Sequence, residues 1–125
     1  MTRATLNSLR QFEAVDWAIS EKADIINMST GMNTWYQAGQ DSVITAYDKG
    51  ALVVASAGND GSEAYHYPAS FDNVLSVAAT TSSGDHAYFS QYNCKIDIAL
   101  PGVAIEITTL NGGYTKASGT SFSAP

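Results

Sequence analysis

The chain has 125 residues, 45% hydrophobic and 14% charged, a length and composition typical of one folded domain and not of a disordered chain. Its formal net charge of −6 is spread without clusters of either sign, which argues against a nucleic-acid partner. No apolar run approaches the roughly 20 residues that a membrane-spanning helix needs.

The first pattern along the chain predicts an amphipathic helix over about residues 7–22. Its apolar side chains recur every three or four positions and so share one stripe: Leu9, Phe12, Val15 and Ile19. The next segment, DIINMS at 24–29, is apolar and rich in β-branched residues, as a buried parallel strand would be.

A second helix is predicted over about residues 37–49, followed at once by a buried strand, ALVVASA, at 51–57. We expect Val43, Ala46 and Tyr47 to face inward, and Gly50 to end the helix in a left-handed conformation. The order strand, helix, strand is a βαβ unit, which joins parallel strands by a right-handed crossover.

The second half of the chain predicts strands but no helix. VLSVAAT (74–80) and KIDIAL (95–100) have the composition of strands, and residues 104–118 predict a hairpin that turns at 111–113. The fold class is therefore α/β, with a parallel sheet flanked by helices. Because such a sheet needs helices on both faces, we expect part of the domain to lie beyond Pro125.

The segment GTSFSAP, at 119–125, has the local chemistry of a nucleophilic serine. A hydroxyl becomes a good nucleophile when a base takes its proton and fixed donors stabilise the oxyanion that forms. Ser121 can sit where a helix begins, so that its own unpaired N–H faces such an oxyanion. The plain alternative is a Ser/Thr/Gly loop that caps a helix. A hydrolase elbow of the form G-x-S-x-G is excluded because position 123 is Ser123.

Five segments in order resemble the subtilisin-like serine proteases. GTSFSAP is similar to their G-T-S-x-[SA]-x-P signature, and four earlier segments match family segments: DIINMSTG, VVASAGNDG, YPASFDNVLSVAA and ALPGVAI. The resemblance runs from about Phe12 to Pro125, nearly the whole chain. It implies a subtilisin-like fold, present only in part, and a serine endopeptidase that hydrolyses peptide bonds through an acyl-enzyme.

The resemblance also implies roles for particular residues. Ser121 would be the nucleophile, and Asn59 the side-chain donor to the oxyanion, although Asn-Asp-Gly alone is also an ordinary turn. An extended polypeptide substrate would add as a strand along two cleft segments, which comprise Ser29, Thr30 and Gly31, and Ser56, Ala57 and Gly58. Thr30 and Met32 depart from the usual Leu and Gly, so the shape of the specificity pocket is left open.

The family's catalytic Asp and His motifs, D-[ST]-G and H-G-T-H, do not occur in the sequence. We do not assign a triad role to His66 or His86, whose segments match loops of the family without a catalytic histidine, and we interpret both as exposed loop residues. The chain alone is therefore expected to be inactive. Cys94 is interpreted as a core or edge residue, and a single cysteine excludes an intrachain disulfide.

Residues 1–125 are thus interpreted as the C-terminal part of a subtilisin-like catalytic domain, truncated at both ends. The alternative is a non-catalytic peptide-binding or interaction module on the same scaffold. The chemistry requires no cofactor, and no metal ligand is assigned. Some relatives hold a cation through carbonyls at positions matching Ala69, Phe71 and Val74, which leaves structural calcium open. Family habit favours secretion, and the oligomeric state is not indicated.

Overall fold

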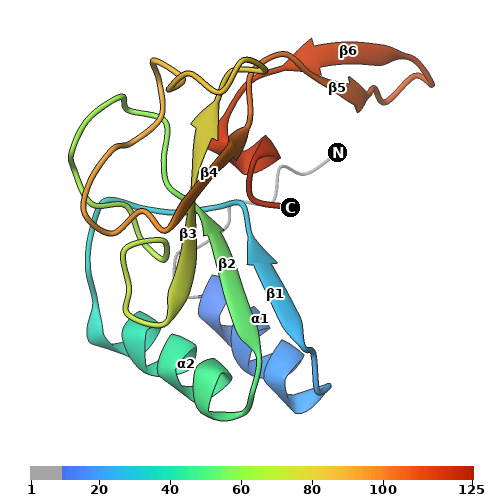
Figure 1. Ribbon diagram of the computed structural model, residues 1–125. Coiled ribbons are helices and arrows are strands. Elements are labelled where there is room, and N and C mark those ends of the chain that lie inside the picture. Colours follow the sequence, from blue (N-terminus) through green and yellow to red (C-terminus); the bar gives the residue numbers. More distant parts are fainter. Residues whose placement is uncertain (1–9) are drawn as a thin grey trace.

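The structure, a computed structural model, describes residues 10–125 (Figure 1). Its elements in chain order are α1 (Arg10–Ser20), β1 (Ile25–Met28), α2 (Gln37–Asp48), β2 (Leu52–Ser56), β3 (Val74–Thr80), β4 (Ile98–Pro101), β5 (Ile105–Thr108), β6 (Tyr114–Ala117) and the 3₁₀ turn η1 (Thr120–Phe122). Strands β1 to β4 form one parallel sheet in the order β1-β2-β3-β4, and β5 pairs with β6 antiparallel. The predicted α/β class is confirmed.

Helix α1 forms where its apolar stripe predicted. Phe12 and Val15 are buried in the core and Ile19 packs against it, whereas Leu9 lies outside the described residues. The ring of Phe12 meets Tyr36 and Phe71 edge to face, with centroids 5.2 and 6.2 Å apart. This aromatic contact ties α1 to the loops that enter α2 and β3.

Helix α2 matches its predicted range, and Gly50 follows it with a φ of 86°. Val43 and Ala46 are fully buried, but the prediction for Tyr47 is wrong, since 58% of that residue is exposed. Val43 and Ala46 lie three residues apart and point into the core, and Tyr47 is turned a further 100° towards solvent.

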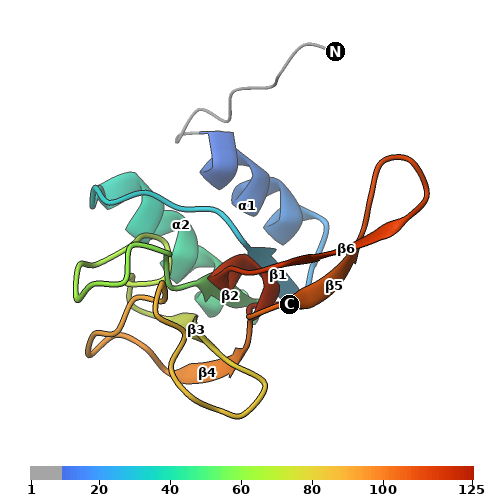
Figure 2. The same ribbon diagram turned by 90° about the horizontal axis from the view of Figure 1, so that it is seen from above.

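The main core lies between α1, α2 and one face of the sheet. It takes alternate residues of the strands, which include Val53, Ala55 and Val74. Figure 2 shows both helices on the same side of the sheet. On the opposite face Val54 and Val77 pack with Ala124, which follows η1. The segment 119–125, which carries the candidate Ser121, therefore packs directly on the sheet.

Strands β1 and β4 are more exposed than their composition indicated. Ile25 is 64% exposed, which corrects the prediction that β1 is a buried strand, and Ile98 in β4 is 40% exposed. Both are outer strands of the sheet, and in the register Ile25 pairs with Leu52, on the face opposite the helices. An apolar run shows that a strand can be buried, but not which layers cover it.

The region from β4 onwards follows the prediction with small shifts. Strand β4 begins at Ile98, three residues later than expected, and the hairpin turns at Asn111, Gly112 and Gly113 as predicted. Figure 1 shows this hairpin projecting away from the sheet. Cys94 is exposed, so it is not a core residue. Within residues 10–125, no helix combines the length and apolar character needed to cross a bilayer.

Candidate active site

The segments that the sequence analysis predicted to form the site meet at the carboxyl ends of the central strands. Ser29 to Gly31 follow β1, Gly58 and Asn59 follow β2, and η1 lies beside both strand ends (Figure 1). Parallel strands bring their carboxyl ends to one edge, where open α/β sheets bind ligands. The fold therefore brings together segments up to 92 positions apart in the sequence, as between Ser29 and Ser121.

Ser121 is half-buried in η1 and bonded to the first cleft segment. Its hydroxyl donates to the backbone oxygen of Ser29 over 3.2 Å, and the Ser29 hydroxyl donates to the backbone oxygen of Ser121 over the same distance. The Ser29 hydroxyl also accepts from the Asn27 side chain at 3.2 Å. These contacts fix the end of β1 against the candidate nucleophile.

Thr120 holds the side-chain amide of Asn59. The backbone N–H of Thr120 donates to Asn59 Oδ1 over 2.8 Å, and its hydroxyl donates to the same oxygen over 2.9 Å. Because a backbone N–H can only donate, Oδ1 must face Thr120, and the assignment of the amide does not depend on a choice of flip. Asn59 Nδ2 is left exposed, with no acceptor among the described residues.

A second donor lies next to this amide along the chain. The N–H of Ser121 is in the first turn of η1 and has no acceptor within residues 10–125, as is usual for the first residues of a helical turn. Thr120 itself is fully buried, and its hydroxyl also accepts from the N–H of Gly58 at 3.3 Å. An exposed amide and a free backbone N–H, held by one buried threonine, suit an incoming anionic oxygen.

The cleft glycines are needed first for packing within the protein. A Cβ on Gly31 would overlap Cε1 of His66 and come within 2.7 Å of the Tyr67 backbone oxygen, and one on Gly58 would lie 3.0 Å from Cγ of His66. The imidazole of His66 therefore sits between the two cleft segments. Our interpretation of His66 as an exposed loop residue is wrong, since it is half-buried and its Nδ1 is buried without a partner.

Neither histidine is bonded to Ser121 in the described part of the chain. Burial lowers the pKa of His66 below its ordinary 6.5 because desolvation disfavours the imidazolium, and this outweighs the opposing effects of the Ser56 backbone and the charge of Asp60. His86 is exposed, and its Nε2 lies 3.1 Å from the backbone oxygen of Ser90. The geometry thus gives Ser121 no imidazole partner within residues 10–125.

The other predicted cleft residues differ in their exposure. Ser56 ends β2 and is buried, as are Ala57 and Gly58, while Thr30 is exposed and donates to Gln11 Oε1 over 2.8 Å. No group of three or more His, Cys, Asp or Glu side chains among residues 10–125 could hold a metal ion. The supporting role of Thr120 was missed, although it stands within the GTS motif.

The chain is similar to known proteins of one family. Residues 5–125 match the model of the Subtilase family. The chain is 39% identical over 121 residues to "Minor extracellular protease Epr" of Bacillus subtilis (strain 168), which covers 96% of the chain and 18% of that protein. It is 36% identical over 115 residues to "Subtilisin DY" of Bacillus licheniformis, over 89% of the chain and 42% of the relative.

Solved structures of related proteins have the same fold as this chain. "Structure of Prenylagaramide maturation protease PagA" superposes on the whole chain with a TM-score of 0.91 at 31% identity and is covered to 48%. "Structure of Patellamide maturation protease PatA" matches 98% of the chain with a TM-score of 0.92 at 30% identity, again over 48% of that structure. The chain therefore spans less than half of each of these relatives.

Proposed function

The chain belongs to the subtilase family, and from this we propose that it supplies the nucleophile and the oxyanion donors of a serine endopeptidase. The observation that carries the proposal is the pair of hydrogen bonds from Thr120 to Asn59 Oδ1, beside Ser121. These bonds aim a neutral amide donor before any reaction begins, which is how enzymes stabilise developing charge without reorganisation.

In the proposed reaction, Ser121 Oγ attacks the carbonyl carbon of a peptide bond while a base takes its proton. The negative oxygen of the tetrahedral intermediate accepts hydrogen bonds from Asn59 Nδ2 and the Ser121 N–H. When the C–N bond breaks, the protonated base gives its proton to the leaving amine and the acyl group stays on Oγ. Water, deprotonated by the same base, then releases the acid and restores the serine. This acyl transfer needs no cofactor.

We infer that the base comes from outside residues 1–125. The sequence contains two histidines, and neither forms a hydrogen bond with Ser121 among the described residues. In a subtilisin, loss of the catalytic histidine alone costs about 10⁶ in kcat. The 125-residue chain alone is accordingly proposed to be inactive, as one part of a longer catalytic domain.

The proposed substrate is an extended polypeptide that pairs with the cleft segments after β1 and β2. Ser29, Thr30 and Gly31 would bind on one side of it, and Ser56, Ala57 and Gly58 on the other. Secretion is proposed because the relative Epr is named an extracellular protease.

The test is made with the complete gene product and its Ser121→Ala variant. A fluorophosphonate probe labels only an activated serine, so we expect labelling and peptide cleavage by the unmodified protein and neither by Ser121→Ala. Peptide binding without labelling would favour the alternative, a non-catalytic binding module. The isolated 125-residue chain should not be labelled, and labelling of that chain would contradict the proposed outside base.

A further inference from the structure

Gln91 is a buried residue whose side-chain amide and backbone N–H both bond the loop that carries Asn59. The side chain is fully buried in the loop between β3 and β4. Its backbone N–H donates to the Gly58 oxygen over 3.2 Å. Its Oε1 accepts from the N–H of Asp60 at 2.7 Å, and its Nε2 donates to Asp60 Oδ2 at 3.1 Å.

These contacts lie on both sides of Asn59. Gly58 precedes the candidate oxyanion donor and Asp60 follows it, so Gln91 fixes the backbone at each end of that residue. Gly58 has a φ of 108°, and a Cβ there would lie 3.0 Å from Cδ of Gln91. The side-chain amide of Gln91 is thus packed against the Gly58 α-carbon, while its backbone N–H bonds the Gly58 oxygen.

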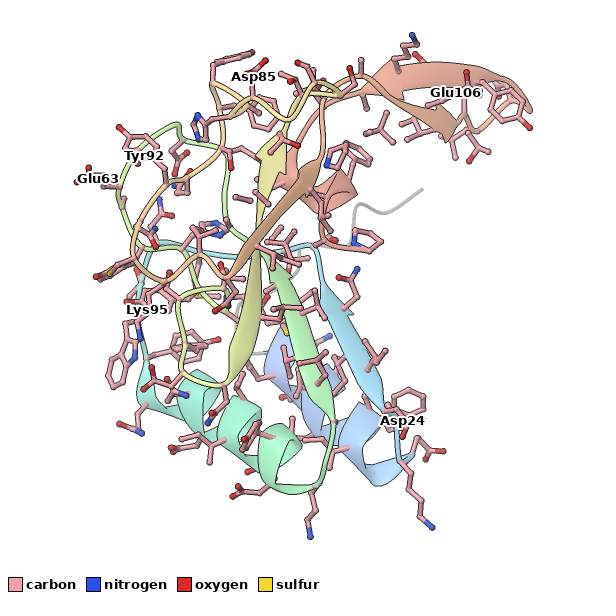
Figure 3. All side chains as sticks on the ribbon, in the orientation of Figure 1. Asp24, Glu63, Asp85, Tyr92, Lys95 and Glu106 are labelled. Carbon is pink, nitrogen blue, oxygen red and sulfur yellow. The ribbon has the colours of Figure 1, made fainter. Side chains whose placement is uncertain are left out.

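The neighbours of Gln91 extend the same contact. The N–H of Gly61 donates to the Phe89 oxygen over 2.7 Å, and the N–H of Tyr92 donates to the Ser62 oxygen over 3.1 Å. Figure 3 shows the labelled Tyr92 and Glu63 in adjoining loops. The segment 89–92 therefore braces the loop 58–62 from one side, while Thr120 holds Asn59 and Gly58 from the other.

We propose that Gln91 is a positioning residue of the oxyanion site, which holds the backbone of Asn59 so that its amide stays aimed beside Ser121. The inference rests on the proposed function, because it assigns Gln91 a part in aiming the donor used there. Its physical basis is that such donors act only when held close to the productive geometry, and a displacement of about 1 Å can cost roughly 10²-fold in rate.

The first experiment replaces Gln91 by methionine in the complete gene product, since methionine has a similar length but cannot form these hydrogen bonds. We expect kcat on a neutral peptide ester to fall by between about 10-fold and 10²-fold, with KM changed by less than about twofold. The matched control is Gln40→Met. Gln40, in α2 and outside the site, is also a buried amide. Its side chain accepts from the backbone N–H of Asp72 at 3.1 Å and donates to the Asp72 backbone oxygen at 3.2 Å. Its loss should leave kcat unchanged within about twofold.

A double-mutant cycle with Asn59→Ala separates an effect on the position of the Asn59 amide from a general disturbance of the fold. If Gln91 acts through the Asn59 amide, Gln91→Met should have little further effect on kcat once that amide is gone. An equal fold-loss in both backgrounds, or an equal loss in Gln40→Met, would overturn the inference. If Gln91→Met does not fold, Asp60→Ala takes its place, because Asp60 is exposed and its replacement removes only the bond from Nε2.

For Asp60→Ala we expect a smaller loss of kcat that also vanishes in the Asn59→Ala background, and a loss that persists there would overturn the inference. Failure of the proposed function has a different signature, since the unmodified protein would then not be labelled by a fluorophosphonate at all. Labelling of the unmodified protein together with full activity of Gln91→Met would reject only the role of Gln91.

Discussion

Ser29 and Ser121 are joined by a reciprocal pair of hydrogen bonds, in which each hydroxyl donates over 3.2 Å to the other residue's backbone oxygen. The pair links the end of β1 to η1 across most of the chain. Because the Ser121 hydroxyl donates to a backbone carbonyl here, the proposed reaction would require it to turn from Ser29 to a base. The Ser29 hydroxyl would keep the backbone of the nucleophile in place during that change.

Ser29→Ala should therefore destabilise the protein by about 0.5–1.5 kcal/mol, since the Ser121 backbone oxygen loses its donor. The free energy of unfolding is measured by urea denaturation of the complete gene product in a Ser121→Ala background, which prevents self-cleavage. Ser20→Ala is the control, because the exposed Ser20 hydroxyl donates to the Trp17 oxygen over 2.7 Å. Equal losses of unfolding free energy in the two variants would show that the hydrogen bond to η1 adds no stability beyond that of an exposed hydroxyl.

Thr120→Val should lower kcat about tenfold with little change in KM. The variant keeps the shape of the side chain, leaves the Gly58 N–H without its acceptor and removes one of the two donors to Asn59 Oδ1. Thr120→Ser keeps the hydroxyl and should lose much less. Asn59→Ala should lose more, because removal of such a donor in a subtilisin costs about 10²–10³ in kcat. If Thr120→Ser is impaired and Thr120→Val is not, the Thr120 methyl group matters rather than its hydrogen bonds.

Gly31→Ala should cost about 1–3 kcal/mol, the usual penalty for overpacking. The added methyl group would overlap His66, and the Tyr67 oxygen cannot withdraw easily because it accepts from the Met32 N–H at 2.8 Å. Thermal unfolding in the Ser121→Ala background measures the effect. Gly113→Ala is a matched control, since its nearest neighbour would be Thr109 Oγ1 at 3.2 Å. A Gly31 variant as stable as the Gly113 variant would contradict the close packing.

The stability of the protein should fall below about pH 6.5 through His66. Burial lowers the pKa of His66 in the folded state, so the unfolded state binds the proton more readily as the pH falls from 6.5 towards the folded pKa. The contribution is complete above the unfolded pKa and is lost on acidification. Urea denaturation from about pH 7 to about pH 5 should show a smaller loss for His66→Gln than for the unmodified protein. A steeper loss of stability in His66→Gln than in the unmodified protein would contradict this prediction.

Much of the fold followed from local patterns. The stripe with Phe12 and Val15 predicted α1, Gly50 marked the end of α2, and Asn111 with the two glycines after it marked the hairpin turn. These features depend on side-chain periodicity and backbone freedom, which neighbouring residues decide. The buried state of β1 was predicted wrongly because it depends on which layers cover the sheet.

Only some residues of the candidate site could be predicted from the sequence. Ser121 and Asn59 lie in segments that resemble those of the subtilisin-like proteases, and that resemblance named both as candidates. The sequence did not indicate the burial of His66, because the residues around a loop histidine do not show whether it faces water or packs between two glycines. Gln91 gave no signal either, since its hydrogen bonds reach residues 31 positions earlier in the chain.

The sequence by itself thus determined the element types, the parallel α/β class and the identity of the candidate nucleophile and its amide donor. The tertiary structure alone decided that Thr120 orients Asn59 Oδ1, that Ser29 bonds to Ser121, and that Gln91 bonds the loop between β2 and β3. The physical reason is distance along the chain. Helices and turns are set by residues a few positions apart, whereas a hydrogen bond aimed within 0.5 Å requires the packed sheet to bring remote segments together.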